Sequence, residues 1–160
     1  MSMLFDIGKK SVPYEILMKE GKLEPDEFQF IRKHPSAGRK ALNDMKCYSE
    51  NIVRMVAEHY EKFDGTGYPF ELKGDKIPLY ARICSIMDVF GALTAPRKNR
   101  PGMTHFAALT EMKNKMEGQF DMRILVNFIK TLADSATAKF SASISAGSSQ
   151  SSGNQVAASA

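Results

Sequence analysis

The chain has 160 residues, of which 43% are hydrophobic, and a formal net charge of +4. This length supports one ordinary hydrophobic core, so we expect a single domain. The charges are mixed rather than gathered into a long basic run, so they give no indication of DNA binding and are compatible with, but do not indicate, a nucleotide ligand.

The cysteines and apolar runs bear on the cellular compartment. The chain has only two cysteines, Cys47 and Cys84, and neither belongs to a CxxC pair, so the sequence suggests neither a disulfide framework nor a zinc ribbon. Residues 1–10 lack the apolar core of a signal peptide, and no later segment approaches the ~20 apolar residues of a membrane span. We therefore expect a cytoplasmic protein without a membrane segment.

The first part of the chain predicts short helices. Residues 1–10 are typical of the last turn of a helix that Gly8 closes. Pro25 suits the first position of a second helix. That helix should pause at His34, because the proline that follows disfavours helical geometry for the residue before it. A further helical segment is expected over residues 36–44.

The middle of the chain predicts an amphipathic helix followed by a shaped turn. Ser49 suits the N-cap of a helix whose apolar face ends at His59. Gly65 and Gly67 then permit backbone angles that other residues avoid, and Pro69 fixes one dihedral angle. On this pattern alone, His59 is either a hydrogen-bonded buried histidine or a metal ligand beside the turn.

A longer helix should run over residues 78–93, where Asp88 falls outside the apolar stripe. Small residues surround Asp88 on the helical wheel, so a neighbouring group or a bound ion could approach it closely. The alternative is tight helix packing beside an ordinary exposed carboxylate. Two more helices are expected, at residues 104–116 and 120–133.

The end of the chain has a different composition. From about residue 135 the sequence is mainly Ala, Ser, Gly and Gln, with one charged side chain, Lys139. Such a segment buries too little apolar surface to order itself, so we expect residues 135–160 to be a disordered tail. The expected domain covers residues 1–134 and is all-α.

Four residues offer the ligand chemistry of a metal site: Asp6, His34, His59 and Asp88. Imidazole and carboxylate together suit Fe, Mn or Zn. Their spacing is not a local metal motif, so only the fold can bring them together. Separately, Arg97 and Arg100 lie in a basic segment flanked by prolines, which suits bidentate contacts to phosphate or is simply a solvated loop.

Five blocks of residues occur in order between Leu4 and Ala133. They are Asp6-Ile7-Gly8-Lys9, His34-Pro35, the run from His59 through Glu61, Asp64 and Gly65 to Gly67-Tyr68-Pro69, the run from Lys73-Gly74 to Ile77-Pro78, and the run from Asp88-Val89-Phe90 to Ala92-Leu93-Thr94. This set is similar to the HD-GYP family of the HD phosphohydrolase superfamily, and five ordered blocks make the resemblance specific.

The resemblance implies a helical bundle that holds two or three Fe or Mn ions and hydrolyses cyclic di-GMP. Metal ions in such a site activate water and neutralise charge on the phosphate. The metal ligands implied are Asp6, His34, His59 and Asp88. The catalytic residues implied are Asp6 and Lys9, and the substrate contacts are Lys9, Tyr68, Arg97 and Arg100.

The chain departs from the family pattern at three positions. Phe5 stands where the family has a histidine, Tyr60 replaces the second of a histidine pair, and Gly91 replaces a frequent Asp. One ion could still find four ligands, but we expect an incomplete multinuclear site and impaired hydrolysis. Binding of ferric iron by a Tyr60 phenolate is a further option.

The departures leave other functions open. The main alternative is a catalytically inactive module that binds cyclic di-GMP or docks a protein such as a diguanylate cyclase domain, and a blander one is a poorly folding remnant. Family domains also have helices ahead of Asp6, and few residues precede it here. We therefore expect a bundle that lacks the usual N-terminal helices and self-associates to cover apolar surface.

Overall fold

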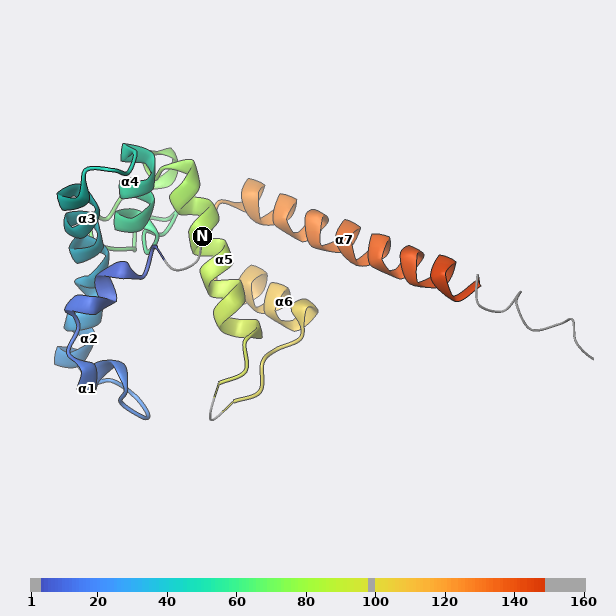
Figure 1. The fold of residues 1–160 in the computed structure, drawn as a ribbon, viewed down its shortest axis with the longest axis horizontal. Helices are drawn as coiled ribbons and strands as arrows, with labels where there is room; N and C mark the ends of the chain where they lie inside the picture. Colours follow the sequence, from blue (N-terminus) through green and yellow to red (C-terminus); the bar gives the residue numbers. More distant parts are fainter. Residues whose placement is uncertain (1–3, 98–99, 149–160) are drawn as a thin grey trace, which may run out of the picture. The chain divides into compact units, whose positions relative to one another are not determined.

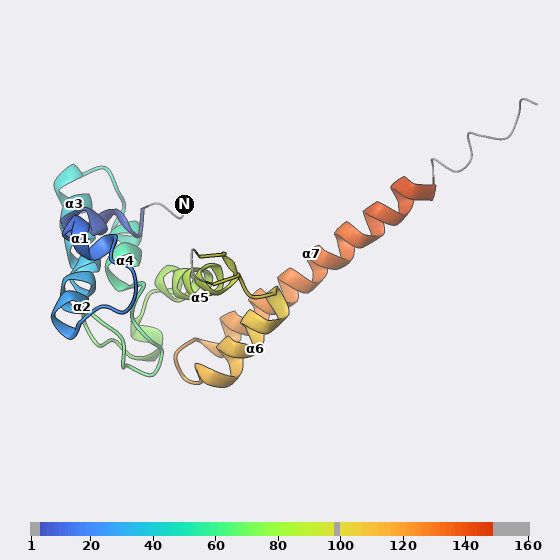
Figure 2. The same cartoon turned by 90° about the horizontal axis from the view of Figure 1, so that it is seen from below.

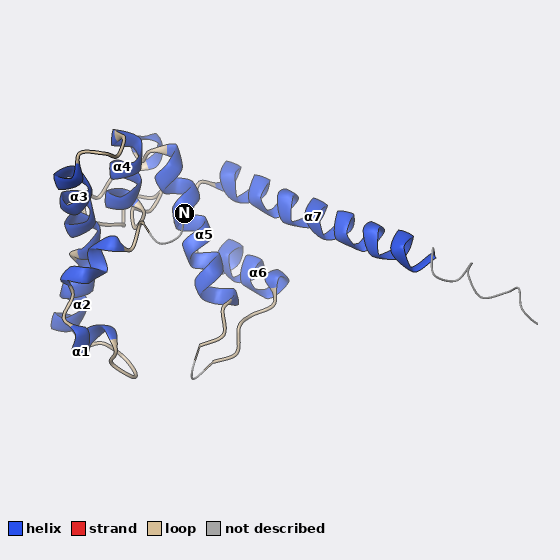
Figure 3. Ribbon diagram, in the orientation of Figure 1, coloured by secondary structure: helices blue, strands red, loops and turns tan. Residues whose placement is uncertain are grey.

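A computed structural model describes residues 4–97 and 100–148. Every regular element in these residues is a helix (Figure 3), which confirms the predicted all-α fold. In chain order the elements are the 3-10 helix η1 (Ile7–Ser11), α1 (Tyr14–Leu17), α2 (Pro25–Arg32), α3 (His34–Met45), α4 (Glu50–Glu58), the 3-10 helix η2 (Gly74–Lys76), α5 (Leu79–Thr94), α6 (His105–Lys115) and α7 (Met122–Ser148).

The chain divides into two compact units, Met1–Ile124 and Leu125–Ala160. In the first unit α3 packs against η1 and α4, α4 against α5, and α5 against α6 (Figures 1 and 2). A buried cluster of Leu42, Val53 and Val56 lies between α3 and α4. The helices that carry His34 and His59 therefore share one core.

Gly8 lies inside η1 and does not end a helix, so that prediction is wrong. A Cβ atom at Gly8 would lie 1.8 Å from the backbone oxygen of His34 and 2.6 Å from the nitrogen of Gly38. Glycine is needed here because η1 and α3 approach each other backbone to backbone.

The predicted break between α2 and α3 is present, but it falls at Lys33. His34 is the first residue of α3, so the prediction that it departs from helical geometry is wrong. Pro35 lies in the first turn, where the missing N–H has no helical partner to lose. The proline therefore starts a helix at this point.

The later helices begin close to their predicted positions. Ser49 is the N-cap of α4 and His59 its C-cap. The side chain of Thr104 accepts a hydrogen bond from the nitrogen of Ala107, 3.2 Å away, and so caps α6. Helix α5 starts at Leu79, one residue from the expected start.

Helix α7 runs from Met122 to Ser148. The prediction of a disordered tail is therefore wrong for residues 135–148, which lie in α7. Residues 149–160 lie outside the described part of the chain. Alanine has the highest helix propensity, and an existing helix extends without a new nucleation cost. Among the described residues, no helix is long and apolar enough to cross a membrane.

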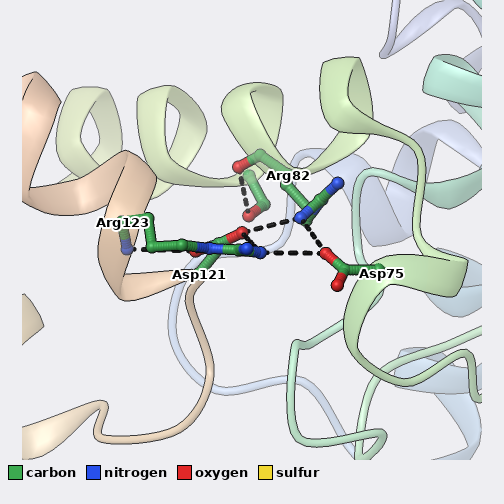
Figure 4. A network of polar contacts seen from close by, with 5 residues as sticks. Asp75, Arg82, Asp121 and Arg123 are labelled. Atoms are coloured by element: carbon green, nitrogen blue, oxygen red, sulfur yellow. Dashed lines mark hydrogen bonds and ion pairs between the residues drawn. The ribbon is translucent and has the colours of Figure 1, made fainter.

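A polar network joins η2, α5 and the start of α7 (Figure 4). The buried carboxylate of Asp121 accepts hydrogen bonds from Nη1 of Arg82 at 2.7 Å and Nη2 of Arg123 at 2.9 Å. Asp75 accepts from the same two arginines at 2.8 and 2.9 Å. The Arg123 guanidinium, followed by the smaller effect of Arg82, lowers the pKa of Asp121 to about 2.

Candidate metal centre

Three of the four predicted ligands lie together. Asp6, His34 and His59 each offer one ligand atom within 4.8 Å of the other two. Nε2 of His34 lies 3.5 Å from Oδ1 of Asp6. The residues come from the segment before η1, the start of α3 and the end of α4, so packing of these elements assembles the cluster.

Both histidines have the same local geometry. Nδ1 of His34 lies 2.7 Å from the backbone oxygen of Ile31, and Nδ1 of His59 lies 2.8 Å from that of Val56. A carbonyl oxygen only accepts hydrogen bonds, so these contacts assign the proton to each Nδ1. Each Nε2 therefore carries a lone pair that can bind a metal ion.

The three converging atoms are buried and unpaired. Within the described part of the chain, Nε2 of His34, Nε2 of His59 and Oδ1 of Asp6 have no hydrogen-bond partner. Buried polar atoms are normally paired, so three orphaned acceptors facing one another require a reason. A cation that accepts a lone pair from each of them supplies one.

Burial also keeps the two imidazoles neutral. It lowers the pKa of His59 to about 4 and lowers the pKa of His34, although the nearby Asp6 opposes both shifts. Neutral imidazole is the form that binds metal. Two histidines and one carboxylate are typical of Fe(II) sites with open coordination positions, and the same atoms suit Mn and Zn.

Asp88 lies outside this cluster of ligand atoms. It is half-buried on α5, and burial raises its pKa, with a further increase from the negative charge of Asp6. The two carboxylates thus interact electrostatically. The role of Asp88 as a metal ligand stays a prediction.

Aromatic rings flank the two imidazoles. The ring centroid of Phe5 lies 5.2 Å from that of His59, and the ring of Tyr60 lies 4.5 Å from His59. Tyr60 also meets His34 edge-on at 5.3 Å. Burial raises the pKa of Tyr60, which disfavours the phenolate that iron binding would need.

Lys9 contacts the site through Asp6. Its Nζ donates to Oδ2 of Asp6 at 2.8 Å, while Oδ1 is the carboxylate oxygen that faces His34. Both side chains are about one-third exposed, at 38% for Lys9 and 32% for Asp6. The lysine therefore orients the carboxylate and leaves positive charge at the edge of the site.

The loop that carries Tyr68 is built around Glu61, a role that the sequence analysis missed. The buried carboxylate of Glu61 accepts hydrogen bonds from the backbone nitrogens of Phe70 at 2.6 Å and Leu72 at 2.9 Å. A Cβ at Gly67 would lie 2.2 Å from the nitrogen of Lys62. The sequence offers one signal for this role, the position of Glu61 two residues after His59.

Tyr68, a predicted substrate contact, is already packed on two groups. Its ring stacks on Tyr60 with centroids 5.0 Å apart and an interplanar angle of 13°. The Cζ atom of Arg32 lies over the Tyr68 ring, 4.8 Å from its centroid. Burial raises the pKa of Tyr68 to about 12. Tyr68 therefore offers a ligand its hydroxyl group rather than a free ring face.

The two predicted phosphate contacts of the basic segment differ in their surroundings. Nη2 of Arg100 donates to the backbone oxygen of Ala92 at 2.9 Å, at the end of α5. Arg97 instead lines a cavity. The backbones of the two arginines pair with each other, and Lys98 and Asn99 between them lie outside the described residues. The structure thus leaves Arg97 better placed than Arg100 to contact a ligand.

The cavity has a volume of about 730 Å³ and lies beside the candidate ligands. Most of its lining is apolar and comes from α4, α5 and the segment before η1. Its apolar lining includes Leu4, Phe5, Ile52, Met55, Tyr80 and Met87. Asp88 and Arg97 provide the charged groups. Its size and composition are within the range of small-molecule sites.

The family follows from comparison with known proteins. A family model described as HD domain matches residues 1–124. The chain belongs to the HD domain family. This HD domain is 38% identical over 130 residues to the cyclic di-GMP phosphodiesterase PA4108 of Pseudomonas aeruginosa, covering 81% of this chain and 31% of the relative. The predicted resemblance is thereby confirmed.

Other relatives extend the range of named substrates. The HD domain is 39% identical to a probable cyclic di-GMP phosphodiesterase of Vibrio cholerae, covering 79% of this chain and 30% of that protein. It is 37% identical to the 3'3'-cGAMP-specific phosphodiesterase 2 of the same organism, covering 78% and 24%. The chain thus spans about a third or less of the length of these relatives.

A solved structure shares the fold of this HD domain. It is described as Bd1817, a HDG"Y"P protein from Bdellovibrio bacteriovorus. The TM-score is 0.65 at 19% sequence identity, and the match covers 82% of this chain and 42% of that chain. At this identity the likeness supports the fold alone.

Proposed function

We propose that this HD domain is a metal-dependent phosphodiesterase that hydrolyses cyclic di-GMP, with activity weakened by Phe5 and Tyr60. The observation that carries the proposal is the group of three buried, unpaired ligand atoms on Asp6, His34 and His59. The names of the relatives supply the substrate class.

The residues divide the work as follows. Asp6, His34 and His59 hold Fe or Mn, with Asp88 as a fourth ligand. A bound ion of this kind activates water and neutralises charge on the phosphate. Lys9 holds one oxygen of Asp6, so that the other faces His34.

The substrate contacts surround this site. The cation of Lys9, the hydroxyl of Tyr68 and the guanidinium of Arg97 contact the substrate. Arg100 contributes less directly, because its guanidinium holds a carbonyl at the end of α5. The cytoplasmic location expected from the sequence belongs to the same proposal.

The rings of Phe5 and Tyr60 favour a second candidate function. They pack against His59, at the two positions where the family has histidines, and a phenyl ring has no atom that binds metal. The alternative is an inactive module that binds cyclic di-GMP or docks a diguanylate cyclase domain. The apolar cavity is consistent with the self-association predicted from the sequence.

One experiment separates the two functions. Protein loaded with iron or manganese is incubated with cyclic di-GMP, and the products are separated by chromatography. Linear dinucleotide or GMP that is absent with His59→Ala supports hydrolysis. Nucleotide binding in calorimetry without any product supports the inactive module. Sedimentation velocity tests self-association, and a monodisperse monomer would contradict it.

A further inference from the structure

Arg32 is a half-buried cation. No carboxylate among the described residues forms an ion pair with it. It is the last residue of α2 and lies two positions before the ligand His34. Within the described residues its guanidinium has one specific neighbour, the ring of Tyr68 at 4.8 Å. Removing a cation partly from water has a cost, which a bound anion offsets.

A column of side chains connects this cation to the candidate metal centre. Arg32 packs on Tyr68, and Tyr68 stacks on Tyr60 with centroids 5.0 Å apart. Tyr60 then meets the imidazole of His34 edge-on at 5.3 Å. The guanidinium is therefore placed next to the site by a series of packed rings and not by a flexible surface position.

The packing also leaves the guanidinium able to bind. The contact with Tyr68 joins Cζ of Arg32 to a ring and pairs none of the five N–H donors of the guanidinium, which lie in its plane. Those donors match two oxygens of a phosphate, and guanidinium is less strongly hydrated than ammonium. The contact with Tyr68 thus leaves these donors available for a bidentate contact.

Charge balance distinguishes Arg32 from the other arginine beside the site. Arg97 lines the same cavity as the carboxyl group of Asp88, and its charge is one of those that lower the pKa of that group. Arg32 has no such neighbour in the described part of the chain. A cyclic dinucleotide carries two phosphodiester groups, and only one of them can lie at the metal ligands.

We propose that Arg32 binds a phosphate of the cyclic dinucleotide through its N–H donors while the ring of Tyr68 packs against the guanidinium. The proposal rests on the proposed function for the substrate class. It makes Arg32 a substrate-binding residue additional to those that the sequence predicts. It also assigns Tyr68 a second role, as the platform for a cation.

The test measures the affinity of metal-loaded protein for cyclic di-GMP by calorimetry. The matched control is Arg39→Ala, because Arg39 also lies over a ring, that of Phe70 at 5.6 Å, but outside the column. We expect Arg32→Ala to weaken binding about 10-fold or more and Arg39→Ala less than about 2-fold. Arg32→Lys keeps the charge and should fall between them.

Three readouts separate binding from a structural role. Metal content and melting temperature should be unchanged in Arg32→Lys, and turnover, where it occurs, should show a raised KM with little change in kcat. Equal affinities of Arg32→Ala and Arg39→Ala would overturn the inference. Protein that binds but does not hydrolyse the nucleotide contradicts only the proposed reaction, whereas wild-type protein without binding contradicts both.

Discussion

His34 and His59 face each other with equivalent tautomers: each ring donates its Nδ1 proton to the carbonyl three residues before it and directs a bare Nε2 inward. The ring centroids are 5.5 Å apart. The backbone of α2 orients one ring and that of α4 the other. The two candidate ligands are therefore preorganised by main-chain acceptors and need no carboxylate to fix their tautomers.

Replacing either of these histidines should remove the bound metal. We expect His34→Ala or His59→Ala to lower metal affinity by on the order of 100-fold, since each variant loses one ligand of the cluster. The chain offers a matched control in its third histidine, His105 of α6, which packs against Phe90 of α5. Metal analysis after dialysis checks this, and metal retained by His59→Ala would contradict the site.

Restoring imidazoles at the two aromatic positions should raise the metal content. We expect Phe5→His combined with Tyr60→His to change the metal content from about one ion per chain toward about two. The reason is that both rings already contact His59, so imidazoles there lie next to an existing ligand. Phe5→Leu with Tyr60→Leu controls for lost packing. An unchanged stoichiometry would show that ring identity does not limit the site.

The hydrogen bonds and ion pairs of Asp121 should make the free energy of unfolding decrease at acidic pH. The folded pKa of Asp121 is about 2, below its ordinary value of 3.8. A lowered carboxyl pKa stabilises the folded state above the ordinary value, and this stabilisation is lost as pH falls toward the folded value. We expect the free energy of unfolding to decrease by on the order of 2 kcal/mol between about pH 4 and about pH 2.

Chemical unfolding across that pH range measures the effect. Asp121→Asn should be less stable near neutral pH and should lose most of this pH dependence. Asp75→Asn is the control, because Asp75 contacts the same arginines but its side chain is 73% exposed. If Asp121→Asn loses as much stability in acid as the wild-type protein does, the pH dependence arises from other carboxylates.

Glu61 should hold the loop that carries Tyr68. Glu61→Gln replaces an oxygen that accepts a backbone hydrogen bond with an amide that cannot accept one, so we expect a loss of about 1–3 kcal/mol in stability. Hydrogen exchange of the Phe70 and Leu72 amides should accelerate. Glu71→Gln is the control, since Glu71 is exposed in the same loop. Equal exchange rates in both variants would refute this role.

The sequence predicts elements that depend on local signals. Apolar periodicity located α4 and α5, and Thr104 marked the start of α6, because capping and amphipathicity act within a few residues. Local composition gave a wrong prediction for the second half of α7, because the low hydrophobicity of residues 135–148 indicated disorder. The helix continues there because Ala and Ser extend a helix that other residues have begun.

The site is harder to predict, because its contacts join distant residues. Asp6, His34 and His59 lie far apart in the sequence, yet each offers a ligand atom within 4.8 Å of the other two. The ligand chemistry of these three residues is visible in the sequence, but their spacing matches no local metal motif, and only the family resemblance groups them as one candidate site. The hydrogen bond from Arg100 to the backbone oxygen of Ala92 depends on how the loop folds back onto α5. No local sequence pattern predicts this contact.

The bare Cα of Gly8 has a consequence for ligand spacing. Because the His34 carbonyl occupies the space of a side chain there, main-chain contact sets how closely η1 approaches α3. Asp6 and His34 move with those two segments. A single methyl group at position 8 would force η1 and α3 apart and so widen the gap between two candidate ligands without touching either side chain.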